Sequence, residues 1–112
     1  MKNKMRYCLA LDLVNEAEKI AAYEACHKEV WPEIITSIKK SGIQSMEIYR
    51  VENRLFMIIE TDDSFSFETK SITDAQNPRV QEWEKLMWNY QQALPFAKPG
   101  EKWILMNKIF SV

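Results

Sequence analysis

The stretch from Ile20 to Ile38 constrains the fold most, because its apolar side chains recur at the spacing of a helix. At about 100° per residue, one set of side chains falls within an arc of about 80°. This set consists of Ile20, Tyr23, His27, Trp31, Ile34 and Ile38. The charged residues around them fall outside the arc. The pattern predicts an amphipathic helix that turns the only histidine of the chain towards the interior.

His27 allows two interpretations on the residues alone. It is either a packed structural histidine, or it faces a cleft and transfers protons, since imidazole gains and loses a proton near neutral pH. Tyr23, one turn earlier, could fix the imidazole tautomer or bind a substrate oxygen. Sugar-binding sites combine flat apolar side chains with a few polar side chains that point towards the sugar. The side chains that could supply these are Trp31, Trp83, Tyr90, Glu60 and Glu84.

Composition excludes several classes of function. Fifteen basic and sixteen acidic residues give a net charge of −1. This balance does not indicate binding to nucleic acid or to an anionic membrane. We expect a single domain over residues 1–112, in the cytoplasm, with no membrane span and no signal peptide. Cys8 and Cys26 suit neither a disulfide framework nor a zinc site. With one histidine and two glycines, we expect neither a metal nor a cofactor.

Hydrophobic periodicity and turn residues predict the order strand, helix, strand, strand, helix, strand. The expected elements are a strand over 5–13, a helix opening at residues 15–16 and running to about 40 with a kink at Pro32, strands over 43–51 and 55–62 joined by a hairpin at 52–54, a short helix or lid-like loop within 63–75, a helix from 78 to about 93, and a strand over 103–110. This order is typical of the α+β, ferredoxin-like split βαβ fold, a four-stranded antiparallel sheet with both helices on one face.

The strands are apolar on both faces, although the helices cover only one of them. In the strand over 55–62, Leu55, Met57 and Ile59 alternate with Phe56 and Ile58. A bare apolar face implies a partner. We therefore expect a homodimer that closes the two sheets into a dimeric α/β barrel.

Residues 23–34, YEACHKEVWPEI, resemble the signature of the L-rhamnose mutarotase family, in which tyrosine, histidine and Trp-Pro-Glu recur at this spacing. The resemblance extends along nearly the whole chain, including Gly42, Ile48-Tyr49 and Trp83. It implies a ferredoxin-like homodimer that interconverts the α and β anomers of a 6-deoxy-L-hexose by acid–base opening and reclosure of the hemiacetal ring, without a cofactor. It also implies that His27 is the proton donor, and that Tyr23 and Trp83 contact the sugar.

Two positions depart from the family pattern. Glu84 stands where the family has the second tryptophan of a pair, and Met46 stands where it has a sugar-contacting tyrosine. With Trp31, these residues complete the predicted substrate-binding set. The resemblance therefore leaves two expected sugars, L-rhamnose and L-fucose. Two rival hypotheses are a cofactor-free monooxygenase of the dimeric ferredoxin-like type and a non-catalytic sugar-binding or dimerisation module.

Overall fold

A computed structural model describes residues 4–112 of the chain. Its elements in chain order are β1 (Met5–Leu13), α1 (Ala17–Cys26), α2 (Pro32–Lys40), β2 (Ile43–Val51), β3 (Arg54–Thr61), α3 (Phe67–Ala75), α4 (Pro78–Trp88), β4 (Gln91–Gln92) and β5 (Ile104–Leu105). Among these residues, no helix is both long enough and apolar enough to cross a membrane.

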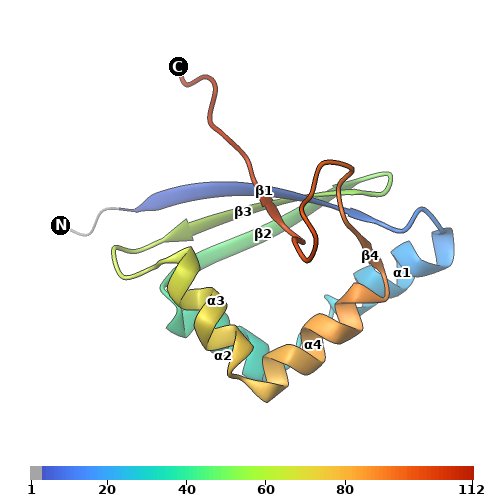
Figure 1. Ribbon diagram of the computed structural model, residues 1–112, viewed down its shortest axis with the longest axis horizontal. Coiled ribbons are helices and arrows are strands. Elements are labelled where there is room, and N and C mark those ends of the chain that lie inside the picture. The colour runs from blue at the N-terminus through green and yellow to red at the C-terminus, as the bar shows by residue number, and fades with distance from the viewer. Residues whose placement is uncertain (1–3) are drawn as a thin grey trace.

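The strands form one antiparallel sheet in the order β2-β3-β1-β4, and β5 also pairs with β1. The two short strands β4 and β5 lie beside different parts of β1, so together they occupy the place expected for one fourth strand. All four helices lie on the same side of the sheet (Figure 1). The protein is thus a small α+β domain with an antiparallel sheet and four helices.

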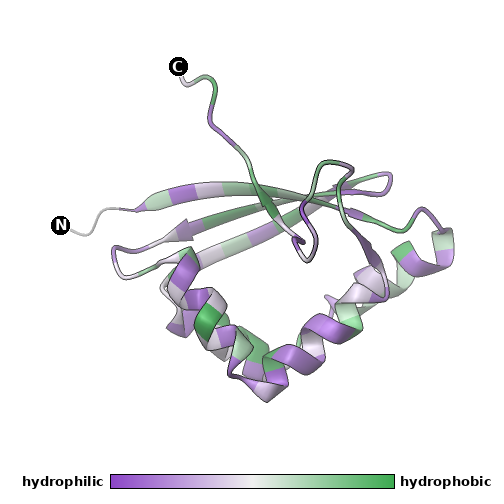
Figure 2. Ribbon diagram, viewed as in Figure 1, coloured by the Kyte–Doolittle hydropathy of each residue, from purple (hydrophilic) through white to green (hydrophobic). Residues whose placement is uncertain are grey.

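The core lies between the helices and the inner face of the sheet. The buried side chains of the central strands alternate as predicted: Leu9, Leu11 and Leu13 on β1, and Leu55, Met57 and Ile59 on β3. Tyr23, Ile34, Val80, Trp83 and Met87 from the helices pack into this layer. Figure 2 shows the apolar colouring along β3, which lies between β2 and β1.

The prediction of one kinked helix up to Lys40 was wrong. Helix α1 ends at Cys26 and α2 begins at Pro32, so residues 27–31 belong to neither helix. A residue before proline avoids the helical region, and Trp31 accordingly has φ −56° and ψ 134°. Pro32 occupies the first turn of α2, where its missing N–H costs nothing. The proline therefore separates two helices instead of bending one.

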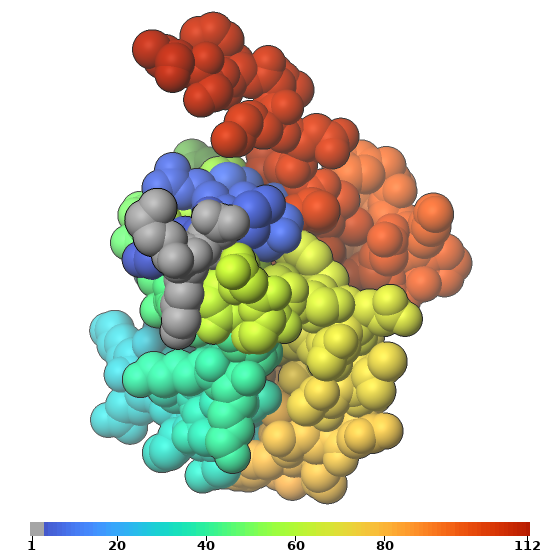
Figure 3. All heavy atoms as spheres, turned by 90° about the vertical axis from the view of Figure 1, so that its left-hand side faces the viewer, coloured from blue at the N-terminus to red at the C-terminus, as the bar shows by residue number. Residues whose placement is uncertain are grey.

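Two further boundaries differ from those predicted near the C-terminal end. Helix α4 stops at Trp88, not near residue 93, because the chain turns and pairs with β1 from Gln91. The strand expected over 103–110 is reduced to β5, extended by one hydrogen bond from the Met106 N–H to the Cys8 carbonyl (2.8 Å). The polar pair Asn107-Lys108 interrupts the apolar run there. The last residues project beyond the sheet (Figure 3).

Gly42, which links α2 to β2, offers a test of this architecture. It has a φ of 102°, and a Cβ there would lie 2.7 Å from the Asp62 Oδ1 and 2.8 Å from the Ser64 Oγ. We expect Gly42→Ala to lower the free energy of unfolding by about 2–4 kcal/mol, since left-handed strain and overpacking add. Urea denaturation measures the loss.

Gly100→Ala is the matched control. Gly100 also has a positive φ, 86°, but its Cβ would enter open space. This variant should lose only about 1–2 kcal/mol, the cost of the backbone conformation. Equal losses in the two variants would contradict the close approach at Gly42.

Candidate active site

A cleft of about 630 Å³ lies between the helices and the inner face of the sheet. A volume of this size suits a small molecule. Apolar side chains of β1, β2 and β3 form much of the wall, among them Leu9, Met57 and Ile59. The polar and aromatic residues on the wall include Tyr23, His27, Lys70, Asp74, Trp83, Glu84, Gln91, Lys102 and Trp103.

His27 stands at the C-terminal end of α1 with its ring fixed on one side. Its Nδ1 lies 2.8 Å from the carbonyl oxygen of Tyr23. A carbonyl oxygen only accepts, so Nδ1 carries the hydrogen and donates it. In the neutral ring, Nε2 is then the nitrogen with the free lone pair. The side chain is half-buried and lines the cleft.

Tyr23 also lines the cleft, although only 4% of its surface is exposed. Its ring packs against the His27 ring, with 4.4 Å between centroids. Burial raises the pKa of Tyr23 to about 12, although hydrogen bonding by the Gln91 side chain lowers it and the neighbouring Cys26 raises it slightly further. The phenol therefore keeps its proton at cellular pH and offers it as a hydrogen-bond donor.

Trp83 closes the other side of His27. The two rings meet edge to face with 5.7 Å between centroids, and Trp83 makes a similar contact with Trp31 at 5.1 Å. Trp31 is not among the residues that line the cleft. It lies behind Trp83, and the Arg79 guanidinium carbon stands 3.8 Å from the centre of its ring. The structure thus gives Trp31 a supporting position.

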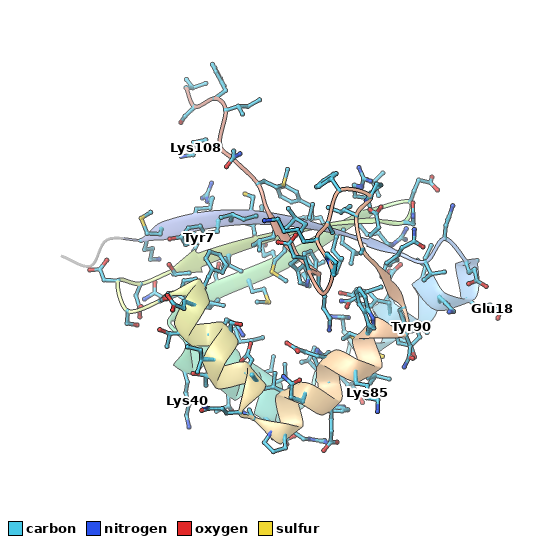
Figure 4. All side chains as sticks on the ribbon, viewed as in Figure 1. Tyr7, Glu18, Lys40, Lys85, Tyr90 and Lys108 are labelled. Atoms are coloured by element: carbon cyan, nitrogen blue, oxygen red, sulfur yellow. The ribbon has the colours of Figure 1, made fainter. Side chains whose placement is uncertain are left out.

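The cleft brings together most of the other residues predicted from the sequence. Met46, from β2, and Glu84, from α4, both line it, and Glu84 accepts a hydrogen bond from Gln81 (3.4 Å). The weaker candidates lie elsewhere. Glu60 is on the opposite face of β3, where it pairs with Arg6 (3.5 Å). Tyr90 packs against the core near the end of α4 (Figure 4) and does not line the cleft.

Sequence reasoning missed several polar residues on the cleft wall. Lys70 and Asp74 form an ion pair (2.6 Å) on α3. For this segment the sequence predicts either a short helix or a loop. Gln91 was placed inside a helix that actually ends earlier. Lys102 and Trp103 come from the segment before β5, whose position depends on long-range pairing. Only the i, i+4 spacing of Lys70 and Asp74 was visible in the sequence.

Within residues 4–112, no group of three or more histidine, cysteine, aspartate or glutamate side chains is arranged to hold a metal ion. Both cysteines are free.

Comparison with known proteins identifies the family of the chain. The model of the L-rhamnose mutarotase family matches residues 6–112. An L-fucose mutarotase of Xanthomonas campestris pv. campestris is 43% identical over 109 residues, covering 96% of this chain and 87% of the relative. An L-rhamnose mutarotase of Oceanobacillus iheyensis is 35% identical over 72 residues, 62% of this chain and 65% of the relative.

The fold has a counterpart among solved structures. The crystal structure of an L-rhamnose mutarotase from Formosa agariphila superimposes with a TM-score of 0.70 at 23% identity, covering 96% of this chain and 98% of the other. The family match and the L-fucose mutarotase relative define a sugar mutarotase, an isomerase that interconverts anomers. The chain belongs to the L-rhamnose mutarotase family.

The raised pKa of Tyr23 predicts a loss of stability in alkali. The phenol has an ordinary pKa of 10.0 and a folded pKa of about 12, so the folded state holds its proton more tightly. Its contribution is fully present below pH 10 and is lost as pH rises towards 12. We expect the wild type to lose about 2–3 kcal/mol more than Tyr23→Phe between pH 9 and 12.

Urea unfolding of both proteins across this range provides the measurement. Below pH 9 the stability difference between them should not change with pH. Parallel pH dependence of the two proteins up to pH 12 would show that burial does not raise the pKa of Tyr23.

Proposed function

We propose that this mutarotase acts on L-fucose, with His27 as the acid–base catalyst. The observation that carries the catalytic assignment is the fixed imidazole at the cleft wall. Because Nδ1–H is bound to the Tyr23 carbonyl, Nε2 is the nitrogen left for a substrate. Among residues 4–112, the structure records no hydrogen-bond partner for Nε2.

Mutarotation requires one proton to leave the anomeric hydroxyl and one to reach the ring oxygen as the C1–O5 bond breaks. Both oxygens are bonded to C1, so a single imidazole nitrogen can serve them. Nε2 of His27 accepts the O1 proton and delivers it to O5, which gives the open-chain aldehyde. Rotation about C1–C2 and the reverse transfers close the ring with the other anomeric configuration.

Tyr23 and Trp83 have supporting roles in this proposal. The high pKa of Tyr23 makes it unsuitable as a base at neutral pH, so its O–H donates a hydrogen bond to a sugar oxygen. Trp83 offers an apolar surface beside His27, suited to the C–H face of a sugar ring. The two residues therefore hold the anomeric centre near Nε2.

The choice of L-fucose rests on the relatives and on two residues of the cleft. The L-fucose mutarotase relative matches nearly the whole chain, whereas the L-rhamnose mutarotase of Oceanobacillus matches about three-fifths of it. Glu84 replaces an aromatic ring of the family pattern with a carboxylate, which binds hydroxyl groups instead of a ring face. Met46 replaces a tyrosine and removes a polar group. These two changes in the cleft wall favour a sugar whose hydroxyl groups point in other directions than those of L-rhamnose.

Saturation-transfer NMR on the anomeric protons tests the proposal. The wild type should accelerate anomer exchange of L-fucose more than that of L-rhamnose. His27→Ala should reduce the acceleration by a factor of about 10²–10⁴, the usual contribution of general acid–base catalysis. Lys28→Ala, at an exposed neighbouring position, is the matched control and should keep the wild-type rate.

The same measurement separates the rival hypotheses. Exchange no faster than in buffer for both sugars would refute mutarotation, and sugar binding without exchange would support the non-catalytic module. Full activity in His27→Ala would remove His27 from the mechanism. A preference for L-rhamnose would overturn the choice of sugar but not the reaction.

We also propose that a second copy of this chain covers the open face of the sheet, giving a ferredoxin-like homodimer. Phe56 and Ile58 of β3 are half-buried and alternate with the buried residues of the inner face, so they lie on the open face. Tyr49 and Val51 of β2 are 54% and 68% exposed there. The apolar residues of the projecting segment near Lys108 are also exposed (Figure 4). An apolar surface of this kind is typical of an interface.

Sedimentation equilibrium tests the dimer. The wild type should have twice the 13.3 kDa mass of one chain. Ile58→Lys, in the middle of the open face, should shift the mass towards the monomer by placing a charge in the interface. Ile72→Lys, at an exposed position on α3, is the control and should remain dimeric. A wild-type mass of one chain would refute the proposal.

We further propose that the protein works in the cytoplasm. Cys8 and Cys26 are both free and half-buried. Free thiols are the rule in a reducing compartment, whereas oxidising compartments favour disulfides.

A further inference from the structure

Gln91 occupies an unusual position beside the catalytic residues. It is the first residue of β4, directly after the turn that ends α4, and its backbone lies opposite Leu13 of β1. Only 7% of its surface is exposed, yet it lines the same cleft as Tyr23 and His27. The polar side chain is therefore held at the inner wall of the active site.

One atom of this side chain has no partner. Gln91 Oε1 is buried, and no group within residues 4–112 donates a hydrogen bond to it. Buried polar atoms are rarely left unpaired, because each has lost its hydrogen bonds to water. Thr61 Oγ1 is the other such atom in this part of the chain, but Thr61 does not line the cleft. Gln91 is thus the residue with an unpaired buried acceptor whose side chain borders the cleft.

The neighbourhood of Gln91 indicates what such a ligand must offer. The Gln91 side chain also lowers the pKa of the Tyr23 phenol, as a hydrogen-bond donor would. An amide oxygen accepts and cannot donate. A group that completes the site must therefore carry an O–H or N–H donor, and sugar hydroxyls are such groups.

We propose that Gln91 is a substrate-contacting specificity residue whose Oε1 accepts a hydrogen bond from a hydroxyl of the bound sugar. The inference rests on the proposed mutarotase function and extends it to a residue outside the family signature. No protein group within residues 4–112 pairs with this buried acceptor, and a hydroxyl of the correct sugar would supply its donor. A site built in this way rejects analogues that lack the hydroxyl, because the acceptor then stays unpaired.

Substitution by methionine tests the role in catalysis. Gln91→Met keeps the length and approximate shape of the side chain but removes the acceptor. We expect kcat/KM for L-fucose exchange to fall about tenfold to a hundredfold. The melting temperature should stay equal or rise, because an unpaired buried atom is removed. Gln92→Met, the exposed neighbour on β4, is the matched control and should match the wild type in both measurements.

Binding of deoxy sugars tests the contact itself, independently of turnover. In a His27→Ala background, ligand-observed NMR gives the dissociation constants of L-fucose and of its 1-, 2-, 3- and 4-deoxy analogues. One analogue should bind about tenfold more weakly than L-fucose when Gln91 is present. Addition of Gln91→Met should abolish that difference for the same analogue and leave the differences for the others unchanged.

The outcomes separate this inference from the proposed function. If the wild type accelerates exchange but Gln91→Met does so equally well, the inference is wrong and the mutarotase function stands. A melting temperature that falls together with activity would assign Gln91 a structural role and overturn the inference. Deoxy-sugar preferences that do not depend on Gln91 would also overturn it. A wild type without exchange activity would instead refute the proposed function.

Discussion

The hydrogen bond from the His27 ring to the Tyr23 carbonyl depends on the end of α1. In a continuous helix, the backbone N–H of residue 27 would donate to the carbonyl of residue 23. Here it donates to the Glu24 carbonyl (3.1 Å), one residue short of that partner, as in the tighter last turn of many helices. The Tyr23 carbonyl is then available to the imidazole Nδ1–H (2.8 Å). Pro32 restricts the backbone of Trp31, so α2 starts as a separate helix after this end of α1.

A chain of ring contacts continues from this bond to the outside of the protein. His27 meets Trp83, Trp83 meets Trp31, and the Arg79 guanidinium covers the outer face of Trp31. Arg79 also binds Glu33 (2.6 Å), so α4 is joined to the first turn of α2. As an exposed ion pair, this contact adds little stability by itself. Its geometric effect is larger, because it fixes Trp31 against Trp83 and so helps to hold the wall beside the imidazole.

The sequence predicted the wall of the cleft better than the path of the chain around it. Tyr23, His27, Trp83, Glu84 and Met46 all line the cleft, and helical periodicity or the family signature indicated each of them. The break at Pro32 was missed, because the apolar stripe continues across it in the sequence even though the helix does not. Gln91 was missed for a related reason. The end of α4 is decided by pairing with β1, a long-range contact that local periodicity does not report.

Strand β3 connects the proposed active site with the proposed interface. Successive side chains of a strand point to opposite faces, so Met57 and Ile59 line the cleft while Phe56 and Ile58 lie on the open face. A one-residue slip of β3 would exchange these two sets. Its register is fixed by pairing with β1 and β2 on either side. The same hydrogen-bonded register thus presents one apolar set to the cleft and the other to the open face, so a shift of β3 would change both the proposed site and the proposed interface.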